Sequence, residues 1–286
     1  MDARERYFWD LTGYLVVKGV LSKEEVEQAN EIVDRYSDRV KVGGATAKDS
    51  TAFAGTGRPM LPGILEFPKP DCDPFRNMLA HPAVVSRLNV MCGKGFRLDH
   101  GPMFIVSTKG TAGHTMHGNG EPHRPHVAYH HQNGVTYVGG VTVAWQLHDC
   151  KEGMGGFACV PASHKANFPM PAGVRTGDAD MGLIKQPIVE AGDVIFFMDS
   201  AQSHGATPWK LDSTRRSILF KYAGRTSSRG GPSQDVAPPE IYWDENIVEG
   251  MTPEQRAVMF GPYSNHRGEI PMLEVTQDGT VYIENK

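Results

Sequence analysis

The chain has 286 residues, of which 40% are hydrophobic and 22% are charged, so it can bury a sizeable core. Its formal net charge of −4 provides no basic face, which excludes a dedicated binder of nucleic acid or of acidic membrane surfaces. No apolar run is long enough to cross a membrane or to act as a signal peptide. Four scattered cysteines without a C-x-x-C pair indicate reduced thiols, and we expect a cytoplasmic protein.

The first third of the sequence predicts helices around a single strand. Ser22 and Glu25 form a capping box, after which apolar residues recur at helical spacing. The expected elements are a helix over 2–11, a strand over 13–17, an amphipathic helix over 23–40 and two short helices over 73–80 and 82–91. Residues 41–72 are rich in Gly, Pro, Ala and Thr, which predicts a long irregular segment of the kind that often covers a functional site.

After residue 95 the sequence changes to short apolar runs punctuated by Gly and Pro. Asn133-Gly134, between Tyr129 and Val135, predicts a hairpin with a type I′ turn. Helices followed by short strands favour an α+β fold around an antiparallel barrel or sandwich. Residues 1–286 contain no repeat or clear linker, so we expect a single domain. The predicted strands cover 96–98, 103–106, 135–145, 156–160, 188–189, 194–197 and 218–220.

Histidines are concentrated in one stretch of the chain. Residues 113–126 contain His114, His117, His123 and His126, and His130 and His131 follow directly. This density indicates a metal site, yet no His-x-Asp or His-x-Glu occurs anywhere in the sequence. A zinc hydrolase is disfavoured, because it needs a general base and usually a third protein ligand, and no His-Glu-x-x-His spacing is present.

A second informative stretch covers residues 191–222. A Gly-Asp turn leads into an apolar strand, His204-Gly205 follows, and Arg215 begins another strand 11 residues after the histidine. On adjacent strands of a barrel, an imidazole that binds a metal and a guanidinium that binds a carboxylate can face one cavity. Arg216 must point to the opposite face of its strand, and we assign the cavity side to Arg215.

Taken together, these segments resemble the phytanoyl-CoA dioxygenase family over about residues 8–225. The resemblance implies an α+β protein with a double-stranded β-helix core, a jelly-roll or cupin-like barrel, flanked by N-terminal helices. It also implies an enzyme that uses Fe(II), 2-oxoglutarate and O₂ to functionalise a C–H bond of a small molecule. The matching segments, in chain order, are residues 13–17, Gly155-Gly156-Phe157 through Ser163-His164-Lys165, the strand after Gly192-Asp193, His204-Gly205 and Arg215.

The resemblance assigns roles to particular residues. His204 is expected to be the distal iron ligand, and Arg215 is expected to bind the far carboxylate of 2-oxoglutarate, with Thr207 as a further cofactor contact. The family's proximal motif is His-x-Asp, and two segments stand near its place, at His117 and at His131. We favour His117, because Asn133-Gly134 after His131 is better explained as the hairpin turn. The remaining candidates for this position are His114, His123 and His126.

Either choice puts asparagine where the family has its carboxylate, and after His117 that residue is Asn119. A neutral amide is a poor ligand for Fe(II), which leaves three alternatives. Chloride can fill the position, as in the related iron halogenases, and chlorination is the favoured outcome. A displaced carboxylate, Glu121 or Asp99, would restore a hydroxylase. In the third alternative two histidines suffice and water completes the site.

The substrate and the class of function leave further alternatives open. His123, Arg124 and His126 suggest a small-molecule substrate with an anionic group, such as a phosphorylated or nucleotide-like compound, although a solvated polar loop explains them equally well. A non-catalytic barrel that binds a small molecule is the rival class, and the retained His204 and Arg215 weigh against it. The sequence sets no oligomeric state.

Overall fold

The structure is a computed structural model of the chain. It describes residues 1–45, 47, 49–118, 128–228, 240, 242–262 and 271–284. In this part of the chain, no helix is both long and apolar enough to cross a membrane.

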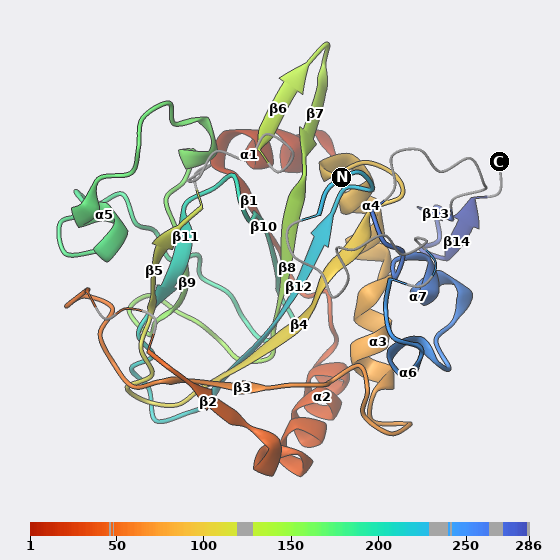
Figure 1. The fold of residues 1–286 in the computed structure, drawn as a ribbon, viewed down its shortest axis with the longest axis horizontal. Helices are drawn as coiled ribbons and strands as arrows, with labels where there is room; N and C mark the ends of the chain where they lie inside the picture. Colours follow the sequence, from red (N-terminus) through yellow and green to blue (C-terminus); the bar gives the residue numbers. More distant parts are fainter. Residues whose placement is uncertain are drawn as a thin grey trace.

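Two antiparallel sheets form the core of the molecule (Figure 1). The strand order is β1-β10-β8-β12-β4-β3-β2 in the large sheet and β5-β11-β9 in the small sheet. The strands of the large sheet are β1 (Tyr14–Val17), β10 (Val194–Met198), β8 (Gly140–Gln146), β12 (Arg215–Ala223), β4 (Arg97–Ser107), β3 (Arg58–Leu61) and β2 (Lys41–Gly43). Those of the small sheet are β5 (His114–His117), β11 (His204–Thr207) and β9 (Gly156–Cys159).

Helices cover the outer face of the large sheet (Figure 1). Strand residues alternate between the two faces of a sheet, and β12 shows the division clearly. Its Ile218 and Phe220 are fully buried against the helices, whereas Leu219 lines a cavity on the inner face. The helices that pack on this outer face are α2 (Lys23–Arg35), α3 (Asp73–Leu79) and α4 (Pro82–Met91).

The remaining elements lie around this core. Helix α1 (Ala3–Thr12) begins at a capping box of Asp2 and Glu5 and leads into β1. The carboxyl-terminal elements pack beside α3 and α4; they are α6 (Glu245–Val248), α7 (Pro253–Ala257), β13 (Met272–Val275) and β14 (Val281–Glu284). The others are the 3₁₀ helices η1 (Ser37–Arg39) and η3 (Ser163–Lys165), the helix α5 (Ala172–Thr176) and the hairpin of β6 (Tyr129–Gln132) and β7 (Val135–Val138).

The structure confirms the α+β class, the jelly-roll core and the flanking N-terminal helices. The type I′ turn is confirmed as well, because Asn133 and Gly134 connect β6 to β7 with φ values of 54° and 77°. The first helices also lie near their predicted bounds, although the helix expected over 23–40 ends at Arg35 and continues as η1.

Three details of the prediction were wrong. Residues 41–72 are not irregular throughout, because β2 and β3 form there and extend the large sheet from β4. Val189 makes only an isolated bridge to Cys150 instead of a strand. The strands that carry the histidines also differ from the prediction. Strand β5 was not foreseen, since it contains no apolar run that predicts a strand from sequence, and β11 with His204 lies in the small sheet instead of adjacent to β12 with Arg215.

Candidate active site

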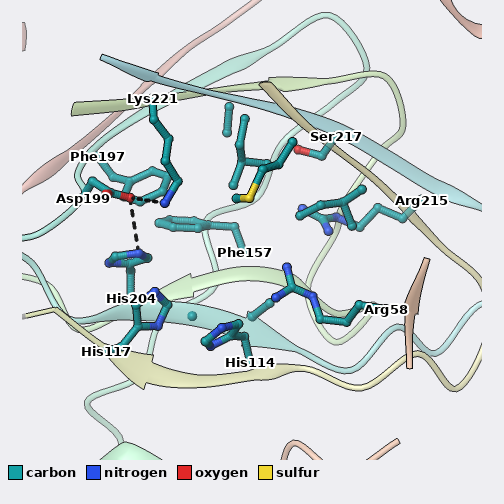
Figure 2. Close-up of a pocket in the computed structure, with 16 residues that line it drawn as sticks. Arg58, His114, His117, Phe157, Phe197, Asp199, His204, Arg215, Ser217 and Lys221 are labelled. Atoms are coloured by element: carbon teal, nitrogen blue, oxygen red, sulfur yellow. Dashed lines mark ion pairs between the residues drawn. The ribbon is translucent and has the colours of Figure 1, made fainter. Parts of the chain in front are cut away.

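A cavity of about 240 Å³ lies between the two sheets. Its walls combine apolar side chains, such as Phe157 and Phe197, with an unusual number of groups that carry charge or bind metals. The small sheet contributes histidines and the large sheet contributes cations and a carboxylate (Figure 2). These polar lining residues are Arg58, His114, His117, Asp199, His204, Arg215 and Lys221.

His117 and His204 are brought together by the pairing of β5 with β11. They are direct partners in the strand register, and their ring centroids are 4.2 Å apart. Nδ1 of His117 lies 3.0 Å from the carbonyl of Thr115, and Nδ1 of His204 lies 2.9 Å from the carbonyl of Gln202. A carbonyl only accepts, so each Nδ1 carries the proton and each neutral ring keeps its lone pair on Nε2.

The cavity keeps its histidines neutral. Burial, followed by the nearby charge of His204, lowers the pKa of His117 to about 4. Burial and the neighbouring His117 lower the pKa of His114 to about 4 as well. Burial also lowers the pKa of His204. Neutral imidazoles are the form that binds a metal, and they need not release a proton first.

The other histidines of the cluster differ in their position relative to the cavity. His114 lies on β5 with its ring 4.4 Å from that of His117 and lines the same cavity. His131 lies exposed on β6, where its Nδ1 is 2.8 Å from the hydroxyl of Thr136, and it is not part of the cavity. His123 and His126 fall outside the described residues, as do Asn119, Glu121 and Arg124.

The two neighbouring arginines point to opposite faces of β12. Arg215 is 4% exposed and lines the cavity, and its Nε has no hydrogen-bond partner. Arg216 reaches the outer face, where it bonds the carbonyl and side chain of Asn30 on α2 and forms an ion pair with Asp34. The strand alternation predicted from sequence therefore places Arg215, and not Arg216, on the cavity side.

Sequence reasoning missed a second guanidinium, that of Arg58 on β3. Burial and the like charge of Arg215 lower the pKa of Arg58. Within the described residues no carboxylate pairs with either guanidinium, so two cations share one shielded space. Such a space favours an anionic ligand. Only the pairing of β3 with β4 brings Arg58 here, and no local sequence signal announces it.

Thr207 takes a place beside the cavity instead of in its lining. It ends β11 opposite Gly156, and its hydroxyl donates to the carbonyl of Gly156 over 3.4 Å. Gly156 itself has a φ of +113°, and a Cβ there would lie 3.0 Å from Nε of Arg215. The absence of a side chain at Gly156 therefore gives the guanidinium its room.

The cavity also contains a carboxylate that sequence reasoning did not find. Asp199 follows β10 directly, and Oδ1 of Asp199 lies 3.6 Å from Nε2 of His204. Asp99, the acid suggested from sequence, is instead fully buried in an ion pair with Arg97 over 2.6 Å and does not line the cavity. The sequence could have indicated Asp199 by its spacing, because a residue two positions after Phe197 points to the same face of the strand.

The residues present fit iron and a dicarboxylate. In the described part of the chain no three His, Cys, Asp or Glu side chains are arranged so that they could hold a metal ion. Two neutral imidazoles whose ring centroids are 4.2 Å apart are nevertheless suitable donors for a divalent metal, and 2-oxoglutarate brings further ligands of its own. The unpartnered Arg215 suits its second carboxylate. A histidine pair and a buried arginine inside a jelly-roll fit the class of iron- and 2-oxoglutarate-dependent oxygenases.

Comparison with known sequences agrees with this class. The chain belongs to the phytanoyl-CoA dioxygenase (PhyH) family, whose profile matches residues 9–217. The family expected from the sequence is thus confirmed, and iron and 2-oxoglutarate are the cofactors expected for its members. No curated protein matches the chain.

Solved structures show the same fold. HygX from Streptomyces hygroscopicus, with nickel, 2-oxoglutarate and hygromycin B bound, is 20% identical with a TM-score of 0.64 over 80% of this chain and 89% of that one. The epimerase SnoN, in complex with Fe³⁺, α-ketoglutarate and nogalamycin RO, is 20% identical with a TM-score of 0.57 over 79% and 85%. The carbocyclase SnoK from nogalamycin biosynthesis is 17% identical with a TM-score of 0.57 over 82% and 89%.

The neutral histidines predict how the stability of the protein depends on pH. The folded state holds His114 and His117 at a pKa of about 4, against 6.5 for an unperturbed histidine. Between pH 6.5 and pH 4, these two histidines take up protons in the unfolded chain but not in the folded protein. The stability that they contribute above pH 6.5 is therefore lost as the pH falls towards 4. We expect a loss on the order of 6 kcal/mol in the free energy of unfolding, about 3 kcal/mol from each histidine.

The measurement is urea denaturation with a chelator present, at a series of pH values. His114→Gln should make the dependence on pH shallower, because one of the two groups is gone. His131→Gln is the control, since this exposed histidine lies outside the cavity. Equal slopes for wild type and His114→Gln would contradict the account.

Proposed function

We propose that the protein is an enzyme that uses Fe(II), 2-oxoglutarate and O₂ to oxidise a C–H bond of a small molecule held between the two sheets. The observation that carries this proposal is the register of β5 and β11, which sets His117 against His204. Both rings keep an Nε2 lone pair available because their Nδ1 atoms bond carbonyls. Arg215 shares the same cavity, and a merely structural barrel would have no need of this combination.

Each residue has a distinct part in this function. His117 and His204 would hold the iron, and Arg215 would bind the far carboxylate of 2-oxoglutarate with two parallel hydrogen bonds. Thr207 acts indirectly, since its bond to Gly156 fixes the backbone against which the Arg215 side chain lies. Iron, when bound, supplies the activation of O₂ that is coupled to conversion of 2-oxoglutarate to succinate and CO₂. Phe157 and Phe197 keep the reacting space apolar.

The substrate is proposed to carry an anionic group. Arg58 is a second cation in the cavity. Because Arg215 alone can bind the far carboxylate of 2-oxoglutarate, Arg58 remains available for another anionic group. A carboxylate or phosphate of the substrate would relieve the repulsion between the two guanidiniums. The segment that contains Arg124 was the sequence-based reason for an anionic substrate, and Arg58 gives an independent one. HygX and SnoN, which share the fold, were crystallised with hygromycin B and nogalamycin RO.

The outcome of the reaction depends on the metal position that the family fills with the acid of His-x-Asp. If this position is open, chloride can enter it, and Asn119 is the residue that favours such chlorination. If another carboxylate fills it, the product is an alcohol. Glu121 and Asp99 were the sequence-based candidates, and the ion pair of Asp99 with Arg97 disfavours that residue.

The compartment is inferred from the cysteines. Cys72, Cys92, Cys150 and Cys159 are all buried, and none of them forms a disulfide. Buried thiols without disulfides are typical of proteins that work in a reducing environment. We therefore propose that the enzyme acts in the cytoplasm.

The neighbouring arginines give a matched test of the cofactor site. Removal of Arg215 loses two charge-assisted hydrogen bonds worth about 1.5–3 kcal/mol each, so Arg215→Met should weaken 2-oxoglutarate binding by about 100-fold or more. Binding is measured without oxygen from the charge-transfer absorption of the Fe(II) complex with 2-oxoglutarate.

Arg216→Met is the control for that test. It removes an equal charge from the other face of β12, so 2-oxoglutarate affinity should stay within about twofold while stability falls by roughly 1 kcal/mol. Unchanged 2-oxoglutarate binding in Arg215→Met would exclude this arginine as the anchor. A wild-type protein that binds neither Fe(II) nor 2-oxoglutarate would instead be a non-catalytic barrel.

A further inference from the structure

We propose that Asp199 supplies the carboxylate ligand of the metal, from the end of β10 rather than from the strand that carries His117. This inference rests on the proposed function and refines it, because it names the acid that replaces the missing member of His-x-Asp. Asn119 stands at the usual place of that acid in the sequence. A carboxylate from another strand can serve the same metal if the fold brings it to the histidines.

The alternation of β10 directs Asp199 into the cavity. Phe196 and Met198 are fully buried on the outer, helix-covered face, whereas Phe197 and Asp199 line the cavity. The backbone N–H of Asp199 donates to the carbonyl of Gly140 over 3.2 Å, which ties the position to the start of β8. Figure 2 shows the carboxylate facing the ring of His204, with His117 beside that ring.

The close contact between Asp199 and His204 is not a hydrogen bond. Nδ1 of His204 donates to the carbonyl of Gln202, so Nε2 presents a lone pair. Oδ1 of Asp199 lies 3.6 Å from this Nε2, so two electron-rich atoms face each other in a buried place. A divalent cation that accepts both lone pairs turns this repulsion into two bonds. His117, directly opposite His204, has a further lone pair. The three side chains are not yet arranged around one ion, so metal binding would have to draw them together.

Neighbouring side chains orient the carboxylate of Asp199 as they would orient a metal ligand. The hydroxyl of Thr142 donates to Oδ1 over 2.8 Å, and Nζ of Lys221 lies 3.4 Å away. Carboxylates that bind metals are characteristically oriented by such hydrogen bonds. Lys221 also places a positive charge beside this carboxylate, which is only 8% exposed. Because Oδ1 is held by these two groups, we expect the metal to replace Lys221 as the cation beside it.

A carboxylate from Asp199 would decide the outcome of the reaction. It would occupy a coordination position that chloride would need, so the product would be an alcohol. One oxygen atom of O₂ then enters the substrate C–H bond, and the other enters succinate as 2-oxoglutarate loses CO₂. Atoms balance as R–H, O₂ and 2-oxoglutarate giving R–OH, succinate and CO₂. This replaces the chlorination favoured from Asn119 alone.

The test measures metal binding directly, without turnover. Co²⁺ is titrated calorimetrically into protein treated with a chelator, for wild type and four variants whose folding is checked by thermal melting. Asp199→Asn should lower the affinity by about 100-fold or more, since loss of an outer hydrogen-bond partner alone costs about 10- to 100-fold. His117→Gln and His204→Gln should lower it similarly. Asp99→Asn is the control, because this buried acid does not line the cavity.

The variants separate the two claims. If the histidine variants lose affinity while Asp199→Asn stays within about twofold of wild type, Asp199 is not a ligand and the proposed function stands. If the histidine variants also bind Co²⁺ as tightly as wild type, the proposed metal site itself is wrong. Should Asp199→Asn fail to fold, Asp199→Ala replaces it, and added formate should restore part of its affinity.

Chloride provides a second, independent readout. The charge-transfer absorption of the anaerobic Fe(II) complex with 2-oxoglutarate is followed during chloride addition at constant ionic strength. In wild type we expect no change, because Asp199 occupies the position, whereas Asp199→Ala should show a shift that depends on chloride. A chloride-dependent shift in the wild type would overturn the inference and restore the chlorinating enzyme.

Discussion

The candidate site depends on one backbone interaction, the pairing of β5 with β11. That ladder sets His117 opposite His204, although 87 positions separate them in the sequence. Carbonyls of Thr115 and Gln202 then fix the Nδ1 atoms, which leaves both Nε2 lone pairs for the cavity. A slip of one residue in this register would turn a ring to the other face of the small sheet. The proposed metal site therefore depends on the strand register as much as on the two histidines.

The large sheet gives the same cavity its charges, because its inner face alternates with a helix-packed outer face. Along β12, Arg215 and Lys221 face inward, while Ile218 and Phe220 pack beneath the helices. These cations stand at different parts of the cavity, with Lys221 beside the carboxylate and Arg215 near Arg58 (Figure 2). A dicarboxylate and a metal can thus be held side by side without extra side chains.

Much of this arrangement could be predicted from local sequence. The choice of Arg215 over Arg216 followed from strand alternation. The turn at Asn133 followed from backbone preference, which also favoured His117 over His131. Asp199 and Arg58 could not be found in this way. Both residues reach the cavity only because β10 and β3 pair with strands that are distant in the sequence. Within the Gly- and Pro-rich residues 41–72, β3 forms because it pairs with β4 and not because of local strand propensity.

The central claim is that the two histidines and Arg215 serve one iron and one 2-oxoglutarate. A crystal structure of the protein prepared without oxygen, with Fe(II) and 2-oxoglutarate, tests it most directly. The account predicts iron bound by Nε2 of both His117 and His204, with the far carboxylate of 2-oxoglutarate against the guanidinium of Arg215. Iron held elsewhere, or 2-oxoglutarate bound away from Arg215, would contradict it.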